Sequence, residues 1–228
     1  MYKYKKSKYL ILVPAFNELK NLKKFIKKIN KFAPLYILDD CSIDKTEHWL
    51  SKNKIKYIKN KKNLGYERNL LNGIKKFKSH CEYLITFDGD GQHKASDLKK
   101  IINLRTTCDI IICNRKNKNR FLEVIISFIS YFFFGLKDPL SGFKVYKTKI
   151  LSEANFKKNE DLFLVDFLFT FIRKNSKIYN FEITTQKRIG KSKVGGPINL
   201  SFKEIRILLK LFLIKFDLKN LNENYFDK

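Results

Sequence analysis

The first half of the chain alternates short apolar, β-branched runs with amphipathic stretches, and this alternation restricts the fold more than any other feature. The apolar runs predict five strands, at residues 9–13, 35–39, 55–58, 83–88 and 109–113. Apolar side chains at helical spacing between them predict helices at residues 22–29, 67–77 and 96–104. Strands that alternate with helices are typical of a parallel sheet in an α/β domain.

Polar side chains follow three of these strands, at the point where each strand ends. They are Asn17 and Glu18 after the first strand, Asp39 and Asp40 at the end of the second, and Asp88, Asp90 and Gln92 after the fourth. In open α/β sheets, ligands bind at the edge formed by the carboxyl ends of the strands. We therefore expect these side chains to line one ligand site.

The segment FDGDGQH at residues 87–93 carries two carboxylates spaced by one residue and an amide two residues further on. The glycines between them let the backbone come close to a ligand. Carboxylate and amide oxygens suit Mg²⁺ or Mn²⁺, which usually complete their coordination with substrate phosphates. An Asp/Gly turn without a ligand is the alternative for this motif alone, but the acidic ends of the neighbouring strands favour a metal site.

Asp39 and Asp40 are a second acidic strand end. Adjacent carboxylates repel each other unless a cation, hydrogen-bond donors, or the hydroxyl and base N–H groups of a nucleoside face them. Ser42 and Asp44 need no such ligand, because either can cap the helix expected after them.

The chain carries 48 Lys and Arg against 22 Asp and Glu, a net charge of +26 that indicates anionic partners. Much of the excess is lysine, in a chain also rich in Ile, Asn and Phe, as A/T-rich coding would produce. A nucleic-acid-binding protein is one alternative, since 21 Phe and 11 Tyr could stack on bases. We expect no nucleic-acid partner, because the carboxylates cluster where that ligand would have to lie.

Four cysteines form no CxxC pair, so the sequence predicts neither a zinc site nor a disulfide framework, and a reducing cytosol is the simplest location. The apolar segment at residues 9–13 is too short for the core of a signal peptide.

Two apolar segments in the second half of the chain suggest contact with a membrane surface. Residues 121–136 include Glu123 and are fewer than the roughly 20 residues that a spanning helix needs. Residues 201–216 place apolar side chains on one helical face, flanked by Lys203, Arg206 and Lys210. This pattern is typical of a helix that lies on an anionic membrane, although packed core helices are the alternative.

Four motifs together resemble glycosyltransferase family 2: PAFNE at 14–18, DDCSIDKT at 39–46, NLG at 63–65 and DGDGQH at 88–93. Two later motifs resemble elements of the polyprenyl-phosphate sugar transferases of that family, which include the dolichol-phosphate mannosyltransferase type: DPLSGF at 138–143 and RIGKSKVGG at 188–196. The similarity covers roughly residues 9–216. It implies an α/β protein of the GT-A type, with a Rossmann-like, mostly parallel sheet flanked by helices and no transmembrane spans.

The resemblance implies a single domain with three parts: a nucleotide-sugar-binding half at residues 1–113, an acceptor-binding half at 114–200, and an amphipathic helix and tail at 201–228. The residues matched to nucleotide-sugar contacts are Pro14, Phe16, Glu18, Asp39, Asp40 and Asp88. Those matched to the metal, Mg²⁺ or Mn²⁺, are Asp88, Asp90 and Gln92. Those matched to the acceptor phosphate are Arg115, Arg120, Ser141, Gly142, Arg188, Ser192 and Lys193. The residues with implied catalytic roles are Asp90, Arg115 and Arg188. For His93, a structural role and a catalytic role are both open.

These roles predict inverting, metal-dependent transfer of a hexose from GDP-mannose or a UDP-sugar to a polyprenyl or dolichyl phosphate. A metal ion stabilises the leaving nucleoside diphosphate. A phosphate acceptor needs no general base, because its second pKa of about 6 leaves it largely a dianion at neutral pH.

The alternative acceptor is a saccharide hydroxyl in the assembly of a cell-surface polysaccharide. A hydroxyl does need a base, for which Glu160, Asp161 or Asp166 would serve. We expect peripheral association with the cytoplasmic face of the membrane, and leave open whether a membrane protein anchors the chain.

Overall fold

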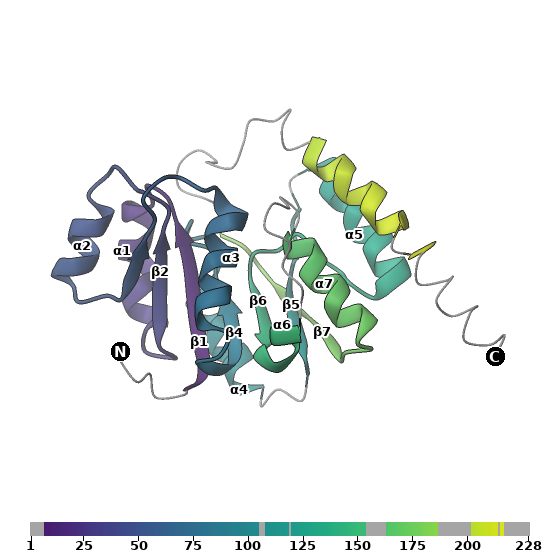
Figure 1. Cartoon of the computed structure of the whole chain (residues 1–228), viewed down its shortest axis with the longest axis horizontal. Coiled ribbons are helices and arrows are strands. Elements are labelled where there is room, and N and C mark those ends of the chain that lie inside the picture. The colour runs from purple at the N-terminus through teal and green to yellow at the C-terminus, as the bar shows by residue number, and fades with distance from the viewer. Residues whose placement is uncertain are drawn as a thin grey trace.

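The computed structural model describes residues 7–104, 108–118, 120–153, 163–186, 202–213 and 215–216. Within these residues, seven strands form one sheet in the order β3-β2-β1-β4-β6-β5-β7 (Figure 1). The strands are β1 (Ser7–Ala15), β2 (Leu35–Asp39), β3 (Tyr57–Lys59), β4 (Cys81–Thr86), β5 (Ile110–Arg115), β6 (Lys144–Lys147) and β7 (Ile178–Ile183).

The sheet is mostly parallel, as the sequence predicted. β1 lies near its centre and pairs in parallel with both β2 and β4, whereas β6 runs antiparallel to both of its neighbours, β4 and β5. All five predicted strands are present. β6 and β7 were not predicted, because β6 has only four residues, two of them lysines, and β7 is only partly buried at the edge of the sheet.

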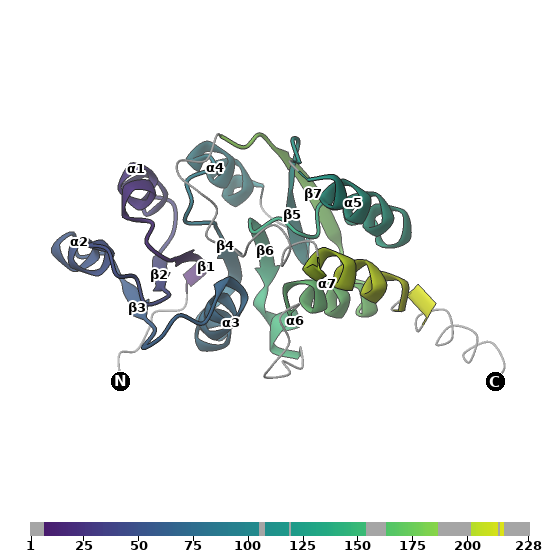
Figure 2. The same ribbon diagram turned by 90° about the horizontal axis from the view of Figure 1, so that it is seen from above.

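Helices cover both faces of the sheet. They are α1 (Leu19–Ile29), α2 (Thr46–Lys52), α3 (Tyr66–Phe77), α4 (Ala95–Asn103), α5 (Phe121–Phe134), α6 (Thr148–Glu153) and α7 (Phe163–Arg173). Figure 2 shows α1 and α4 on one face, and α3, α6 and α7 on the other. A further helical segment, which we call the C-terminal helix, comprises residues 202–213.

The apolar run in β1 divides its side chains between two cores. Ile11 and Val13 pack on the face covered by α1 and α4, while Leu10 and Leu12 pack on the face covered by α3 and α7. A strand that is buried on both faces has to be apolar along its whole length, which explains why this run does not alternate with polar residues.

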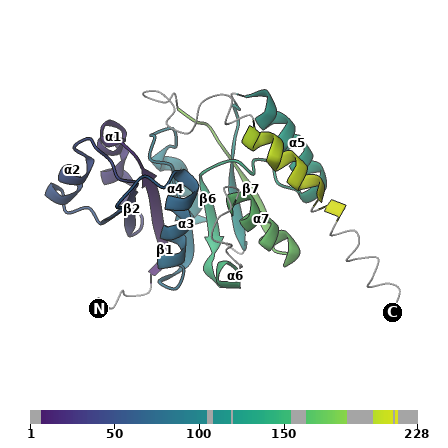
Figure 3. The same cartoon turned by 45° about the horizontal axis from the view of Figure 1, so that its top comes forward.

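The C-terminal helix lies beside α5, as Figures 1 and 3 both show. Ile207 and Leu211 of the C-terminal helix share a small apolar core with Ile126 of α5 and Phe169 of α7. The start of the C-terminal helix also contacts α3, where Lys203 forms an ion pair with Glu67. This helix is therefore packed against the domain along one side.

Two side-chain contacts of Asn69 fasten α3 to the carboxyl ends of β2 and β3. The side-chain amide of Asn69 donates a hydrogen bond of 2.7 Å to the backbone carbonyl of Leu38. The side-chain oxygen of Asn69 accepts a second one, of 2.9 Å, from Asn60. Since Asn69 is buried, these bonds fix the height of α3 relative to the strand end.

We predict that Asn69→Ala lowers the free energy of unfolding by about 1–3 kcal/mol, because it leaves the Leu38 carbonyl buried without this donor. Asn72→Ala on the same helix is the matched control, since Asn72 is exposed. Urea denaturation of both variants measures the difference. Equal stability of the two variants would contradict this role of Asn69.

Candidate active site

The ends of β1 and β4 meet at one edge of the sheet, as the sequence predicted. The loop after β4 passes directly over the end of β1: a Cβ atom on Gly89 would lie 2.5 Å from the backbone oxygen of Pro14. Only glycine permits this approach, because that neighbour is backbone and cannot rotate away. The acidic DGD segment is thereby placed against the PAFNE segment.

The loop after β1 is fixed by the loop after β2. The backbone N–H of Asn17 donates to the hydroxyl oxygen of Ser42 over 2.8 Å, and the Asn17 side chain accepts from the backbone N–H of Ile43 over 2.8 Å. Asn17 holds a left-handed backbone conformation with φ of 54°. Ser42 therefore binds the neighbouring loop, whereas Asp44 accepts a hydrogen bond from the first N–H of α2, at Thr46.

Asp39 is buried and only partly satisfied by the protein. One carboxylate oxygen accepts a hydrogen bond of 3.1 Å from the Ser42 backbone, and the other has no partner in the part of the chain that the structure describes. Burial raises the pKa of Asp39, and this outweighs the opposing effect of the Ser42 hydrogen bonds. A buried acceptor without a partner is costly, so a donor group on a ligand would be stabilised beside it.

Asp40 has a different environment from Asp39. Its carboxylate accepts hydrogen bonds from the side chain of Asn60 and from the backbone N–H groups of Leu64 and Gly65, at 2.8 to 2.9 Å. Asp40 therefore holds the turn that precedes α3. The sequence indicated that adjacent carboxylates need groups facing them that offset their repulsion, but not that the protein itself supplies those groups to Asp40. A contact of Asp40 with nucleotide sugar stays a prediction.

Asp88 is held on three sides. The Tyr66 hydroxyl donates to one carboxylate oxygen over 2.6 Å, and the other oxygen lies 2.9 Å from Nε2 of His93. On the third side is Gly142, where an added Cβ would lie 2.1 Å from the Asp88 carboxylate. Burial alone would raise the pKa of Asp88, but the hydrogen bonds from His93 and Tyr66 and the charge of Arg115 lower it. Asp88 is therefore ionised at neutral pH.

Asp90 and Gln92 follow Asp88 on the same turn. Asp90 accepts a hydrogen bond of 3.0 Å from the backbone N–H of Gln92, and the Gln92 carbonyl accepts one of 2.8 Å from the backbone of Gln186. The described residues contain no cluster of three or more His, Cys, Asp and Glu side chains that could hold a metal ion. Two carboxylates and an amide fit an ion of the Mg²⁺ type, which takes its other ligands from water and substrate phosphates.

Arg115 is bound to Asp138, a fully buried acid from the turn after α5. Its Nε and Nη2 atoms donate to the two Asp138 oxygens over 2.9 and 3.1 Å, and its backbone N–H donates to the same carboxylate. Burial would lower the pKa of Arg115, but the Asp138 hydrogen bonds raise it above its usual range. This bidentate pair ties β5 to the turn at residues 138–142, the predicted acceptor turn.

Arg120 is also paired with carboxylates. It contacts Glu123 on α5 and lies 3.1 Å from Glu204 on the C-terminal helix. Glu123 in turn lies 3.7 Å from Arg115. Two of the three arginines predicted to face phosphates are thus paired with acids from separate elements, and Glu123 lies near both of them. Sequence reasoning missed the acids because they come together only in the folded chain.

The predicted acceptor turn is closed by contacts of its own. Ser141 is buried, and the Gly142 carbonyl accepts a hydrogen bond of 2.7 Å from the Thr86 hydroxyl. Lys144, the next polar residue, is buried and donates to the Ser141 carbonyl. Burial lowers the pKa of Lys144 to about 8, against the opposing charges of Asp138 and Asp88. Nothing in the sequence signalled that this lysine is buried.

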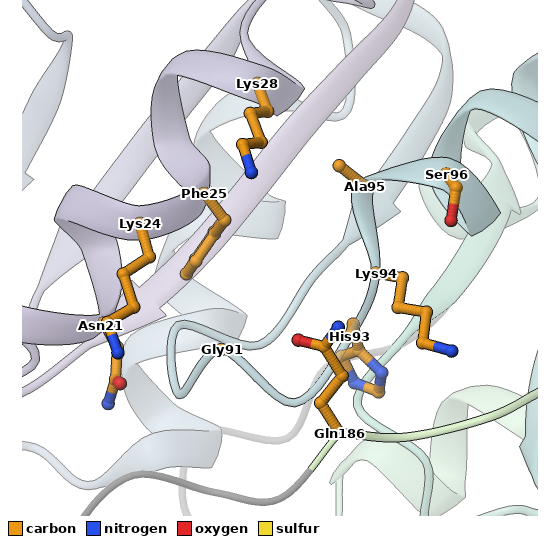
Figure 4. Close-up of a pocket in the computed structure, with 10 residues that line it drawn as sticks. All are labelled: Asn21, Lys24, Phe25, Lys28, Gly91, His93, Lys94, Ala95, Ser96 and Gln186. Carbon is orange, nitrogen blue, oxygen red and sulfur yellow. The ribbon is translucent and has the colours of Figure 1, made fainter.

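A pocket of about 670 Å³ opens beside the DGD segment. Figure 4 shows Asn21 and two lysines of α1 facing His93 and Lys94 across it. The lining lysines are Lys24, Lys28 and Lys94. They make this side of the site positive, which favours an anionic ligand nearby.

Several predicted residues lie outside the described residues. These are Arg188, Ser192 and Lys193, together with Glu160, Asp161 and the side chain of Asp166. Their assignments stay predictions, as do those of Pro14, Phe16 and Glu18 as nucleotide contacts.

The family model for glycosyl transferase family 2 matches residues 10–177. Over 180 residues the chain is 26% identical to UDP-N-acetylglucosamine–dolichyl-phosphate N-acetylglucosaminyltransferase of Methanococcus voltae, covering 63% of this chain and 72% of that protein. Over 217 residues it is 22% identical to undecaprenyl-phosphate mannosyltransferase of Micrococcus luteus, covering 83% and 88%.

The fold is similar to that of glucosyl-3-phosphoglycerate synthase from Mycobacterium tuberculosis, solved with Mn²⁺, UDP and phosphoglyceric acid. The TM-score is 0.71 at 15% identity, covering 91% of this chain and 78% of that one. This similarity confirms the predicted GT-A type of fold.

We predict that Lys144 makes the protein more stable as pH rises from about 8 towards 10.5. In this range the folded state has released the Lys144 proton, while the unfolded chain, with the ordinary lysine pKa of 10.5, still binds it. Since the unfolded state then holds more protons, raising the pH favours folding. Other groups titrate here too, so the comparison is with Lys144→Met, in which this contribution is absent.

Urea denaturation between about pH 7.5 and 9.5 should show wild type gaining about 1–2 kcal/mol relative to Lys144→Met. Parallel pH profiles of the two proteins would show that Lys144 keeps an ordinary pKa in the folded state.

Proposed function

Because the chain belongs to glycosyl transferase family 2, and is therefore a glycosyltransferase, we propose that it transfers a hexose from a nucleotide sugar to a polyprenyl phosphate, with inversion at the sugar. The observation that carries the donor half of this proposal is the carboxyl edge of the sheet, where β2 ends in Asp39 and the loop after β4 carries Asp88 and Asp90. The acceptor half is supported by the relatives from Methanococcus voltae and Micrococcus luteus, whose names state dolichyl and undecaprenyl phosphate.

In the proposed donor site, the nucleoside lies against the ends of β1 and β2. The unpartnered oxygen of Asp39 supports this placement, since ribose hydroxyl and base N–H groups are donors. Asp88, Asp90 and Gln92 would hold Mg²⁺ or Mn²⁺, which would stabilise the charge of the departing diphosphate. The donor is GDP-mannose or a UDP-sugar; the neighbour from Mycobacterium tuberculosis was solved with UDP.

The proposed acceptor site lies at the turn of Asp138 to Gly142. Arg115 stands beside this turn, with its guanidinium fixed by Asp138 and its side chain 22% exposed. Its charge would attract an acceptor phosphate and help to offset the repulsion between that phosphate and the donor diphosphate. A phosphate dianion attacks without a general base, so the proposal needs none.

We also propose that the chain binds the cytoplasmic face of a membrane peripherally. On α5, Phe121, Phe128 and Phe132 are more than 70% exposed. On the C-terminal helix next to it, the exposed apolar residues are Phe202, Ile205, Leu209, Phe212 and Leu213. We call the exposed apolar side chains of α5 and the C-terminal helix the apolar platform.

Anionic lipid is the occupant we propose for this platform. Basic side chains accompany the apolar ones on the C-terminal helix, including Arg206 and Lys210, whereas Lys203 is paired with Glu67 of α3. Rings that enter the headgroup region beside lysines and arginines are what interfacial helices present to anionic lipid. Within the described ranges, no helix is both long enough and apolar enough to cross a bilayer.

We predict that the purified protein transfers label from one nucleotide sugar into organic-extractable lipid when given Mg²⁺ or Mn²⁺ and polyprenyl-phosphate liposomes. A panel of radiolabelled GDP-mannose, UDP-glucose and UDP-N-acetylglucosamine identifies the donor. Asp90→Asn should reduce the rate at least about 100-fold, the scale expected when charge stabilisation of a transition state is lost.

Metal-dependent binding of a nucleotide sugar without any labelled lipid would contradict the proposal that the acceptor is a lipid phosphate. The search would then turn to a saccharide hydroxyl as the acceptor, with Asp161 tested as its base.

We predict that Phe128→Ser combined with Phe212→Ser weakens binding to liposomes that contain anionic lipid at least about tenfold, because two rings lose their burial in lipid. Ile43→Ser is the matched control, since Ile43 is 87% exposed but lies on the loop after β2, away from the platform. Flotation of all three proteins measures the difference. If the double variant floats as well as wild type, the platform does not contact lipid.

A further inference from the structure

Tyr66 begins α3 and reaches the acidic site from the α3 face of the sheet. Its ring packs against the core on that face, while its hydroxyl donates to Asp88 over 2.6 Å. His93 reaches the same carboxylate from the opposite face, where its ring packs against Phe87 and Phe143. Asp88 is therefore hydrogen-bonded by side chains from both faces of the sheet.

The two hydrogen bonds leave Asp88 able to bind a cation. A carboxylate oxygen has two lone pairs, and Tyr66 and His93 each use one lone pair on a different oxygen. The Gly142 backbone blocks the third side, so the carboxylate has little freedom to rotate. What remains for a ligand is one lone pair on each oxygen, held in a fixed direction.

We propose that Tyr66 is a positioning residue of the donor site, whose hydroxyl fixes the Asp88 carboxylate in the orientation that binds the divalent metal ion. This inference rests on the proposed function, because it needs Asp88 to be a metal ligand. Hydrogen bonds to metal-binding carboxylates set their orientation, and their loss typically costs about 10–100-fold in metal affinity.

Tyr66 is suited to this task because it stays a donor. A tyrosine hydroxyl ordinarily has a pKa of about 10, far above the neutral range. The hydroxyl therefore keeps its proton throughout the neutral range.

The position of Tyr66 is fixed in turn by the residue before it. Gly65 has a φ of +82°, and its backbone N–H donates to Asp40 over 2.8 Å. Asp40 thus supports the turn that places Tyr66 under Asp88. Asp40 therefore has a structural role that does not depend on contact with substrate.

The test measures Mn²⁺ binding in the presence of UDP and, separately, of GDP, with electron paramagnetic resonance reporting the free ion; the nucleotide that supports binding to wild type is then used for the variants. Tyr66→Phe should weaken Mn²⁺ binding at least about tenfold, because the Asp88 carboxylate loses one of its two fixed hydrogen bonds. The Mn²⁺ concentration for half-maximal activity should rise by the same factor, while kcat at saturating Mn²⁺ returns close to the wild-type value. A general loss of structure would lower kcat as well, and would not raise only the Mn²⁺ concentration needed for half-maximal activity.

Tyr57→Phe is the matched control. It removes a tyrosine hydroxyl that contacts Ser51 and lies 3.4 Å from the Glu47 carboxylate, on strand β3 at the far edge of the sheet. Its Mn²⁺ affinity should equal that of wild type.

Two different failures can be told apart. Wild-type affinity in Tyr66→Phe would overturn the role of Tyr66 and leave the metal site standing. Absence of Mn²⁺ binding by wild type with UDP and also with GDP would overturn the metal site itself, and the role of Tyr66 with it.

Discussion

The contact between the Asp88 carboxylate and the backbone of Gly142 is the constraint on which the rest of the site depends. It joins the end of β4, in the part of the chain predicted to bind the donor, to the turn predicted to bind the acceptor. The Thr86 hydroxyl reinforces it by donating to the Gly142 carbonyl. Any larger residue at 142 would push the two turns apart, so this glycine sets the separation between the proposed donor and acceptor phosphates.

Basic residues near this contact differ from those that give the chain its large positive charge. Arg115 is fixed in a bidentate pair, and Lys144 is buried with its pKa lowered to about 8. Both are held by neighbouring acids or carbonyl groups in defined directions. The exposed lysines contribute to the field around the molecule but not to the geometry of the site, which is why total charge said little about function.

The sequence predicted what depends on local pattern. Apolar runs located the five strands of the first half, and the preference of βαβ units for parallel pairing then placed Asp39 and Asp88 at one edge of the sheet. β6 was not predicted because its antiparallel pairing between β4 and β5 is a long-range interaction with no local sequence pattern. The partners of Asp40 and Arg120 were not predicted for the same reason. A charged residue in the sequence does not show whether the protein or a ligand will pair with it.

The ion pair between Lys203 and Glu67 helps to determine how deep the proposed site would sit relative to lipid. It fastens the first turn of the C-terminal helix to the residue next to Tyr66. With that helix on a bilayer, the Asp88 carboxylate would stand at a set height above the headgroups. A polyprenyl phosphate carries its phosphate at the headgroup level whatever the length of its isoprenoid tail. An enzyme built in this way would select its acceptor by the height of the phosphate, and the tail could vary in length without changing the distance that the sugar has to travel.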